Sequence, residues 1–320
     1  GVIWDKCGRL CGIRVYGLMY AASCFLTAHG SSFYALILGR ILGGTSTAIL
    51  FSVFEAWLVS QSGKLGLSGE ALGEIFTKQT IVNSLVAVSR RVFIFSQSLA
   101  DFVSVESVFD LAALVCLVVA IFAGQILQEE NYGAAETETK SGFSSAIGTI
   151  MSSWPICAVG LVQSLFEGAM YAFVLMWTPA LSIEGDDIPH GLIFSALMLA
   201  MLNGSLMNDR FNPRLEVVLA CSAFALTSVS ILSVISIRFA AFLTFESCVG
   251  AFWPLMAGLR SKLVPEESRC AVLSLFRVPL NLIVIWLLSS SLALEMIFAV
   301  CGAFLLVTVL ILINIRSRIY

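Results

Sequence analysis

Long apolar runs alternate with short polar breaks along almost the whole chain. A helix needs roughly 20 apolar residues to cross a hydrocarbon core about 30 Å thick. By this criterion the pattern predicts ten transmembrane helices, at about residues 12–28, 33–59, 75–99, 108–127, 154–181, 191–207, 215–237, 239–259, 271–291 and 292–315. The last run is apolar on every face, whereas the strands of a membrane β-barrel alternate between polar and apolar positions. The predicted fold class is therefore an all-α polytopic membrane protein.

The longest polar stretch divides the predicted helices into two groups. Residues 128–152 combine five charged side chains with glycine and serine, a composition typical of a linker. We predict an N-terminal bundle of four helices over residues 1–127, a cytoplasmic linker over 128–152, and a C-terminal bundle of six helices over 153–320.

Composition excludes an ordinary water-soluble protein. Of the 320 residues, 58% are hydrophobic and 12% are charged, about half of the roughly 25% charged residues found in soluble domains. The net charge of −3 gives no argument for nucleic-acid binding, so the expected surroundings are the lipid bilayer. Loops rich in Lys and Arg remain in the cytoplasm. With the N-terminus inside, 13 of the 18 basic residues fall on that side, and both termini are cytoplasmic.

The first nine residues carry a charged turn. The pattern Gly1-x-x-x-Asp5-Lys6-x-Gly8-Arg9 resembles the signature loop of the major facilitator superfamily, which joins the second and third helices in that family. Glycine permits a tight turn, and Asp5 beside Arg9 can bridge helix ends and stabilise one gating state. The resemblance implies a fold of two helical bundles with twelve helices. Ten of the twelve would then be present, with two expected before Gly1 in a chain that is incomplete at its N-terminus.

Two further patterns extend this resemblance. A fainter copy of the signature loop occurs at residues 204–214, at the equivalent place in the other half. In the second predicted helix, Arg40-x-x-x-Gly44-x-x-x-Ala48 places small residues at helical spacing, which allows close helix packing.

Three acidic residues lie inside predicted membrane helices. An ionisable side chain in mid-membrane costs roughly 2.5–3.5 kcal/mol on insertion scales, so each is a candidate for function. They are Glu55, Glu167 and Glu246, each preceded by phenylalanine. We assign them coupling or gating roles, and Glu55 and Glu246 occupy equivalent helices that could face each other. The alternative is structural: Glu55 could simply pair with a basic residue near the end of its helix.

Among the cations within predicted helices, Arg40 and Arg277 are the best candidates, because a guanidinium donates two hydrogen bonds to an oxyanion and stays charged. Arg277 precedes Pro279 and Asn281, and Asn83 is the positional counterpart of Asn281. We predict that the two amides line a central cavity, although a hydrogen bond between helices explains them equally well. The adjacent pair at residues 90 and 91 points about 100° apart on a helix, so it is not assigned to the site.

The fifth predicted helix carries the densest set of polar residues. Gln163, Glu167 and Tyr171 step by four and share one helical face. Apolar packing alone does not explain hydrogen-bonding groups along one face of a membrane helix. This face therefore indicates a binding surface.

Four longer stretches point to one branch of the superfamily. Residues 43–57, 166–171, 189–195 and 276–281 are similar to the eukaryotic molybdate-anion transporter family, and the similarity covers most of the chain. It implies import of molybdate across a membrane by alternating access of two six-helix bundles. No motif encodes which membrane this is, and the location we expect is the plasma membrane. On this hypothesis Arg277 holds the anion with Asn281, Asn83, Tyr171 and Gln163.

The remaining functional roles follow from that hypothesis. Glu167 would bind a proton and offset charge, and the other coupling or gating residues would be Glu55, Glu246, Arg40, Asp5 and Arg9. Two alternatives stay open: a porter for another solute, such as sulfate or a sugar, and a non-transporting or defective membrane paralogue. Oligomeric state is not encoded in any motif.

We do not expect an enzyme. An intramembrane hydrolase needs a nucleophile, base or metal constellation, and neither His29 nor His190 joins the membrane acids. The nine cysteines include no Cys-x-x-Cys pair, so no metal site or cofactor is expected.

Overall fold

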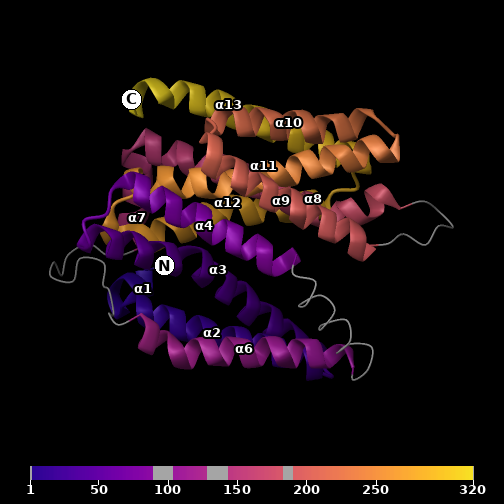
Figure 1. Cartoon of the computed structure of the whole chain (residues 1–320). Helices are drawn as coiled ribbons and strands as arrows, with labels where there is room; N and C mark the ends of the chain where they lie inside the picture. The colour runs from indigo at the N-terminus through magenta and orange to yellow at the C-terminus, as the bar shows by residue number, and fades with distance from the viewer. Residues whose placement is uncertain (1, 89–103, 128–142, 183–189, 320) are drawn as a thin grey trace. The chain divides into compact units, whose positions relative to one another are not determined.

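The computed structural model describes residues 2–88, 104–127, 143–182 and 190–319, and every regular element within these ranges is helical (Figure 1). The helices form two compact units. Unit 1 comprises residues 1–67, 90–152 and 264–275, and unit 2 comprises residues 68–89, 153–263 and 276–320. Each unit includes a segment from the other half of the chain. The predicted division into two bundles by chain order stays a prediction.

Helix α2 forms the middle of unit 1 and packs along both α3 and α6 (Figure 1). A β-carbon added to Gly17 of α2 would lie 2.6 Å from the carbonyl oxygen of Cys116 on α6, so glycine permits this close approach. The elements of unit 1 are α1 (Val2–Cys7), α2 (Arg9–His29), α3 (Phe33–Lys64), α6 (Val105–Ile126), α7 (Phe143–Ser152) and the 3₁₀ turn η1 (Glu266–Ser268).

The small-residue contact between α2 and α3 is offset from its predicted position. Within the described residues no atom lies within 4 Å of a β-carbon added to Gly44. A β-carbon added to Gly43 would instead lie 2.7 Å from the Ser23 hydroxyl, which donates to the Gly39 carbonyl at 2.7 Å. The prediction of close packing through Gly44 is therefore wrong, because α3 turns the neighbouring face, with Gly39 and Gly43, toward α2.

Unit 2 has a core of stacked phenylalanines between α8 and α11. Phe166 and Phe252 stack with ring centroids 3.6 Å apart, and Phe173 packs against Phe242 at 5.1 Å. All four rings are fully buried. The elements of unit 2 are α4 (Gly69–Val88), α8 (Trp154–Leu181), α9 (His190–Phe211), α10 (Leu215–Ile231), α11 (Ile235–Leu263), α13 (Leu294–Ile319) and, from Phe276 onward, α12 (Arg269–Ser289).

Helices α9 and α11 cross through two reciprocal glycines. A β-carbon added to Gly204 would lie 1.7 Å from the carbonyl oxygen of Ser247, and one added to Gly250 would lie 1.9 Å from that of Met201. The Ser205 hydroxyl donates to the Gly250 carbonyl at 3.1 Å across the same contact. Both positions require glycine because the obstructing atoms belong to the backbone and cannot rotate away.

We expect Gly204→Ala to destabilise unit 2 by about 1–3 kcal/mol, the usual cost of inserting a methyl group into a packed interface. The thermal unfolding midpoint of the detergent-purified protein measures this loss. Gly44→Ala is the matched control, because the added methyl meets open space and alanine favours helix over glycine by about 1 kcal/mol. An unchanged midpoint for Gly204→Ala would contradict the crossing.

Ten of the described helices overlap the ten predicted spans, with local differences, and residues 89–99 of the third predicted span lie outside the described residues. By length and composition alone, eight of the described helices could cross a membrane, namely α2, α3, α6, α8, α9, α11, α12 and α13. The boundary predicted near residue 238 lies instead at residues 232–234, where α10 ends and α11 begins. Arg238 therefore belongs to α11, and its side chain pairs with Glu295 at 2.9 Å.

Two polar segments contain more helix than the sequence predicted. The linker segment includes α7, whose apolar residues recur at helical spacing and bury Ala146. The fainter signature loop predicted at residues 204–214 is wrong in its extent, because α9 continues to Phe211. The helix ends only where Asn212 adopts a left-handed conformation (φ 42°), immediately before Pro213.

Candidate functional site

A chain of buried polar side chains crosses the interior of unit 2. It starts on α8, where Gln163 and Glu167 are one helical turn apart and the Gln163 amide donates to the Glu167 carboxylate at 2.7 Å. The two side chains are 5% and 1% exposed. Burial of a charge at this depth requires partners that satisfy it.

Arg277 on α12 is a charged partner of Glu167. Nη1 of Arg277 lies 3.4 Å from the second carboxylate oxygen of Glu167, and Nη2 donates to the Tyr171 hydroxyl at 3.4 Å. Arg277 is itself only 8% exposed. The face predicted from the spacing of Gln163, Glu167 and Tyr171 therefore meets the predicted arginine.

Local packing fixes the position of Arg277. The Ser164 hydroxyl donates to the carbonyl oxygen of Phe276 at 2.6 Å, linking α8 to α12 at the residue before the arginine. Gly160 accommodates the Phe276 ring, since an added β-carbon would lie 2.4 Å from two ring atoms. A hydrogen bond and a glycine pocket thus hold Arg277 opposite Glu167.

Arg260 is a member of this network that the sequence analysis missed. Its Nη1 donates to the carbonyl oxygen of the Gln163 side chain at 2.9 Å, and the residue is 4% exposed. The distribution of basic residues predicts only that Arg260 lies on the cytoplasmic side or at that interface. The overlooked signal is its spacing of 14 residues from Glu246, which places it close to the same face of one long helix.

The buried network carries two positive charges and one negative charge. Arg260, Gln163, Glu167 and Arg277 form a continuous series of hydrogen bonds that ends at Tyr171. Guanidinium groups bind oxyanions through paired N–H donors. The network contains two of them: Arg277 pairs directly with the Glu167 carboxylate, and Arg260 is linked to that carboxylate through Gln163. The network therefore has the chemistry to bind an anion.

The other predicted site residues lie outside this network. Asn281 is one helical turn beyond Arg277 and exposed, and Asn83 on α4 is also exposed. Arg40 is exposed on α3, Glu55 is half-buried on the same helix, and Glu246 is buried on α11. Glu55 and Glu246 belong to different compact units. The roles of these five residues stay predictions.

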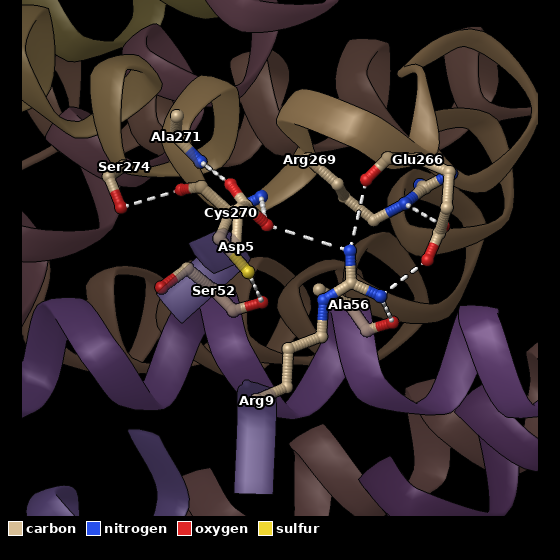
Figure 2. Close-up of polar contacts among 9 residues, drawn as sticks. All are labelled: Asp5, Arg9, Ser52, Ala56, Glu266, Arg269, Cys270, Ala271 and Ser274. Carbon is tan, nitrogen blue, oxygen red and sulfur yellow. Dashed lines mark hydrogen bonds and ion pairs between the residues drawn. The ribbon is translucent and has the colours of Figure 1, made fainter. Parts of the chain in front are cut away.

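A second polar cluster lies in unit 1 and centres on Arg9, as Figure 2 shows. The guanidinium is fully buried. It donates to the Ala56 carbonyl at 3.0 Å and to the Glu266 carbonyl at 3.0 Å, and it pairs with the Glu266 carboxylate. Asp5, at the end of α1, lies 3.5 Å from Arg9. Arg9 of the predicted signature loop is thus joined both to Asp5 of the same loop and to η1.

Asp5 occupies the N-terminus of α12 within the same cluster (Figure 2). Its carboxylate accepts hydrogen bonds from the backbone N–H groups of Cys270 at 3.4 Å and Ala271 at 3.1 Å. A carboxylate at this position satisfies N–H groups that have no partner within the helix and interacts favourably with the helix dipole. Burial raises the pKa of Asp5 above its usual value, against the opposing influence of Cys270 and Arg9.

The turn that brings Asp5 and Arg9 together depends on glycine. Residues 2–7 form the short helix α1, and Gly8 separates it from α2 with a φ of 93°. This conformation is costly for any residue with a β-carbon. The role predicted for glycine in this turn is confirmed at Gly8.

Two further predictions concern the arginines at residues 90 and 91 and the expectation that there is no metal site. The arginines at residues 90 and 91 lie outside the described residues. Across ranges 2–88, 104–127, 143–182 and 190–319, no group of three or more His, Cys, Asp or Glu side chains could hold a metal ion.

Comparison with known proteins agrees with this architecture. Residues 1–252 match the model of a family described as sugar transporters with 12 transmembrane segments. A protein of Xenopus tropicalis called molybdate-anion transporter is 28% identical over 295 residues, which cover 87% of this chain and 64% of the relative. The chain thus spans just under two thirds of the length of that relative.

Solved structures show the same fold. The human organic anion transporter MFSD10 (TETRAN) aligns with a TM-score of 0.70 at 15% identity, over 98% of this chain and 79% of that one. The major facilitator superfamily transporter FucP, in its outward conformation, aligns with a TM-score of 0.63 at 14% identity, over 94% and 82% of the two chains. At these identities the similarity concerns the fold, which is the predicted major facilitator fold.

Proposed function

Because the chain belongs to the major facilitator family of twelve-span transporters whose model matches residues 1–252, we propose that it moves a small inorganic oxyanion, molybdate or a close analogue, across a membrane by alternating access. The proposed location is the plasma membrane, with both termini in the cytoplasm. The observation that carries the proposal is the buried pair of Arg277 and Glu167.

The pair suggests how an anion could be bound and released. The Glu167 carboxylate is an internal anion that accepts a hydrogen bond from Nη1 of the Arg277 guanidinium. An incoming oxyanion would take the place of this carboxylate beside Tyr171, and Asn281 lies one helical turn beyond Arg277 on α12. Glu167 would then keep its hydrogen bond from Gln163 and take up a proton, because a buried carboxylate separated from its cation is costly. Substrate binding and proton binding would be coupled through this exchange.

The cluster around Arg9 supports a gating role within unit 1. It ties α2 and α3 to η1 and the start of α12 through two carboxylates and two backbone carbonyls. Hydrogen bonds and ion pairs are short-ranged, so a cluster of them between helix ends is either formed or broken as the helices move. We assign Asp5 and Arg9 to the contact that stabilises one conformation of the transport cycle.

The choice of molybdate rests on the name of the similar Xenopus protein. The description of the matching family favours a second candidate, a sugar. The two buried guanidinium groups of Arg260 and Arg277 favour an anion over a neutral sugar, because a guanidinium donates paired, charge-assisted hydrogen bonds to an oxyanion.

Uptake of radiolabelled molybdate by the full-length protein, in cells that lack molybdate transport, tests the proposal. We expect saturable uptake above the empty-vector control, lowered by excess sulfate and unchanged by excess glucose. If the protein reaches the cell surface but molybdate uptake equals that of the empty vector, the proposal is wrong. Uptake of a labelled sugar in the same cells would instead select the second candidate.

A further inference from the structure

Gln163 occupies the middle of the buried network in unit 2, between a cation and an acid. Its Oε1 accepts a hydrogen bond from Nη1 of Arg260 at 2.9 Å, and its Nε2 donates to Oε1 of Glu167 at 2.7 Å. A guanidinium carries N–H donors and no acceptor, so only the oxygen of the amide can bind to Arg260. Arg260 therefore fixes the orientation of the Gln163 amide, with its NH₂ group toward Glu167.

Both carboxylate oxygens of Glu167 consequently face donors. Oε1 accepts from the Gln163 amide, and Oε2 lies 3.4 Å from Nη1 of Arg277, a second group without an acceptor. A proton on either oxygen would place one donor opposite another. Hydrogen bonds to the charged form of an acid favour that form. These contacts hold Glu167 as a carboxylate while Arg260 and Arg277 are in place.

The two oxygens differ in how their contacts can end. The contact of Oε2 ends when Arg277 turns to an incoming anion. The contact of Oε1 ends only if the Gln163 amide rotates, which would place its NH₂ group against the donors of Arg260. Because Arg260 and Gln163 are 4% and 5% exposed, solvent offers little compensation for that loss. Oε2 is therefore the oxygen that can take up a proton.

Few other charged side chains lie on the helices that pack against α8. The described ones outside the network, on α11, α13 and the unit 2 part of α12, are Arg238, Glu246, Lys262 and Glu295. Arg238 and Glu295 pair with each other at 2.9 Å, and Lys262 is exposed. Glu246 is 14 residues from Arg260, about 21 Å along α11. We therefore relate the protonation of Glu167 to the two arginines of the network.

We propose that Arg260 and Gln163 form a lock that imposes an order on binding: the anion reaches Arg277 first, and a proton then binds to Oε2 of Glu167. This inference rests on the proposed function, since an anion must displace Glu167 from Arg277. Arg260 and Gln163 are then positioning residues, which act through Glu167. The coupling is reciprocal, so the anion and the proton raise the affinity for each other by the same factor.

Infrared spectroscopy of the purified full-length protein in lipid nanodiscs tests the lock, because a protonated carboxyl group has its own C=O stretching band. The Glu167 band is the part of the spectrum that Glu167→Gln removes. Without ligand, we expect no such band between about pH 8 and pH 5, the range in which an ordinary glutamate is ionised. Saturating molybdate should produce the band in this range.

Variants of Arg260 separate the lock from a purely structural role. Arg260→Met frees the amide to rotate, so the ligand-free Glu167 band should appear at a pH about one to two units higher than in the wild type, the equivalent of one charge-assisted hydrogen bond. Arg260→Lys keeps a cation that only donates and should restore the wild-type spectrum. The matched control Thr308→Val removes a buried hydroxyl of α13, which donates to the Leu305 carbonyl at 2.6 Å, and should leave the spectrum unchanged.

Gln163→Glu tests the lock even if Arg260→Met fails to fold. It keeps the length of the side chain but places an acceptor opposite Oε1 of Glu167, so the two carboxyl groups should share a proton without ligand. The resulting band should disappear when Glu167→Gln is added.

The outcomes distinguish the lock from the proposed function. A Glu167 band in the ligand-free wild type near neutral pH, or no band in Gln163→Glu, would overturn the lock. If molybdate binds by isothermal titration calorimetry without producing the band, the order of binding is wrong. If molybdate does not bind while the ligand-free spectra are as expected, the proposed substrate is wrong and the lock on Glu167 stands.

Discussion

Arg277→Ala is expected to lower anion uptake by about 100-fold or more. A guanidinium donates two charge-assisted hydrogen bonds to an oxyanion, each worth about 1.5–3 kcal/mol, and each 1.4 kcal/mol corresponds to a factor of ten. The variant leaves the Glu167 carboxylate without its guanidinium on α12 and removes the donor to Tyr171. The initial rate of labelled uptake, divided by the amount of protein at the cell surface, is the measurement.

Three further variants separate substrate binding from folding. Glu167→Gln combined with Arg277→Ala removes both charges, so folding should recover toward the wild type while uptake stays low. Arg277→Lys keeps the charge but loses the two-pronged geometry, and we expect intermediate uptake. Arg210→Ala changes an exposed arginine in the same unit and should leave uptake close to that of the wild type. Unimpaired uptake by Arg277→Ala would remove this residue from the substrate site.

Arg9→Met is expected to destabilise unit 1 by about 3–5 kcal/mol, the cost of breaking a buried charge network from one side. Methionine retains most of the side-chain volume but none of the donors. Asp5 then loses its guanidinium and keeps its partners at the start of α12, whereas Glu266 keeps Arg269, which lies 3.2 Å away. Thermal unfolding of the purified protein should show the loss as a lowered midpoint and reduced expression.

The neighbouring residue Lys6 supplies the control for Arg9. Lys6 is exposed on α1, so Lys6→Met should change the unfolding free energy by no more than about 0.5 kcal/mol. Adding Asp5→Asn to Arg9→Met should restore part of the lost stability, because it removes a carboxylate that no longer faces a cation. If Arg9→Met unfolds like the wild type, the cluster does not stabilise unit 1.

The sequence predicted those features correctly that depend on a single helix or turn. The steps of four from Gln163 to Tyr171 placed three polar side chains on one face, because helical geometry depends only on spacing. Gly8 was recognisable because a tight charged turn needs a residue that tolerates positive φ. In each case the relevant interaction lies within a few residues along the chain.

Features that depend on contact between distant helices were predicted less well. Arg260 and Gln163 are 97 positions apart and meet through a side-chain hydrogen bond. The offset of the α3 contact from Gly44 to Gly39 and Gly43 depends on how α2 packs against it. A hydropathy pattern records that a helix is apolar, but in lipid every face can be apolar, so the pattern does not say which face meets a neighbour.

The sequence by itself determined the class of protein, the approximate position of each membrane helix and the polar face of α8. These follow from the cost of placing polar groups and backbone in hydrocarbon, which acts on each segment separately. The tertiary structure alone decided that Glu167 pairs with Arg277, that Asp5 caps α12 and that Gly204 and Gly250 form the crossing of α9 and α11. Those outcomes depend on distances between atoms that are far apart in the chain, and packing sets these distances only when the helices come together.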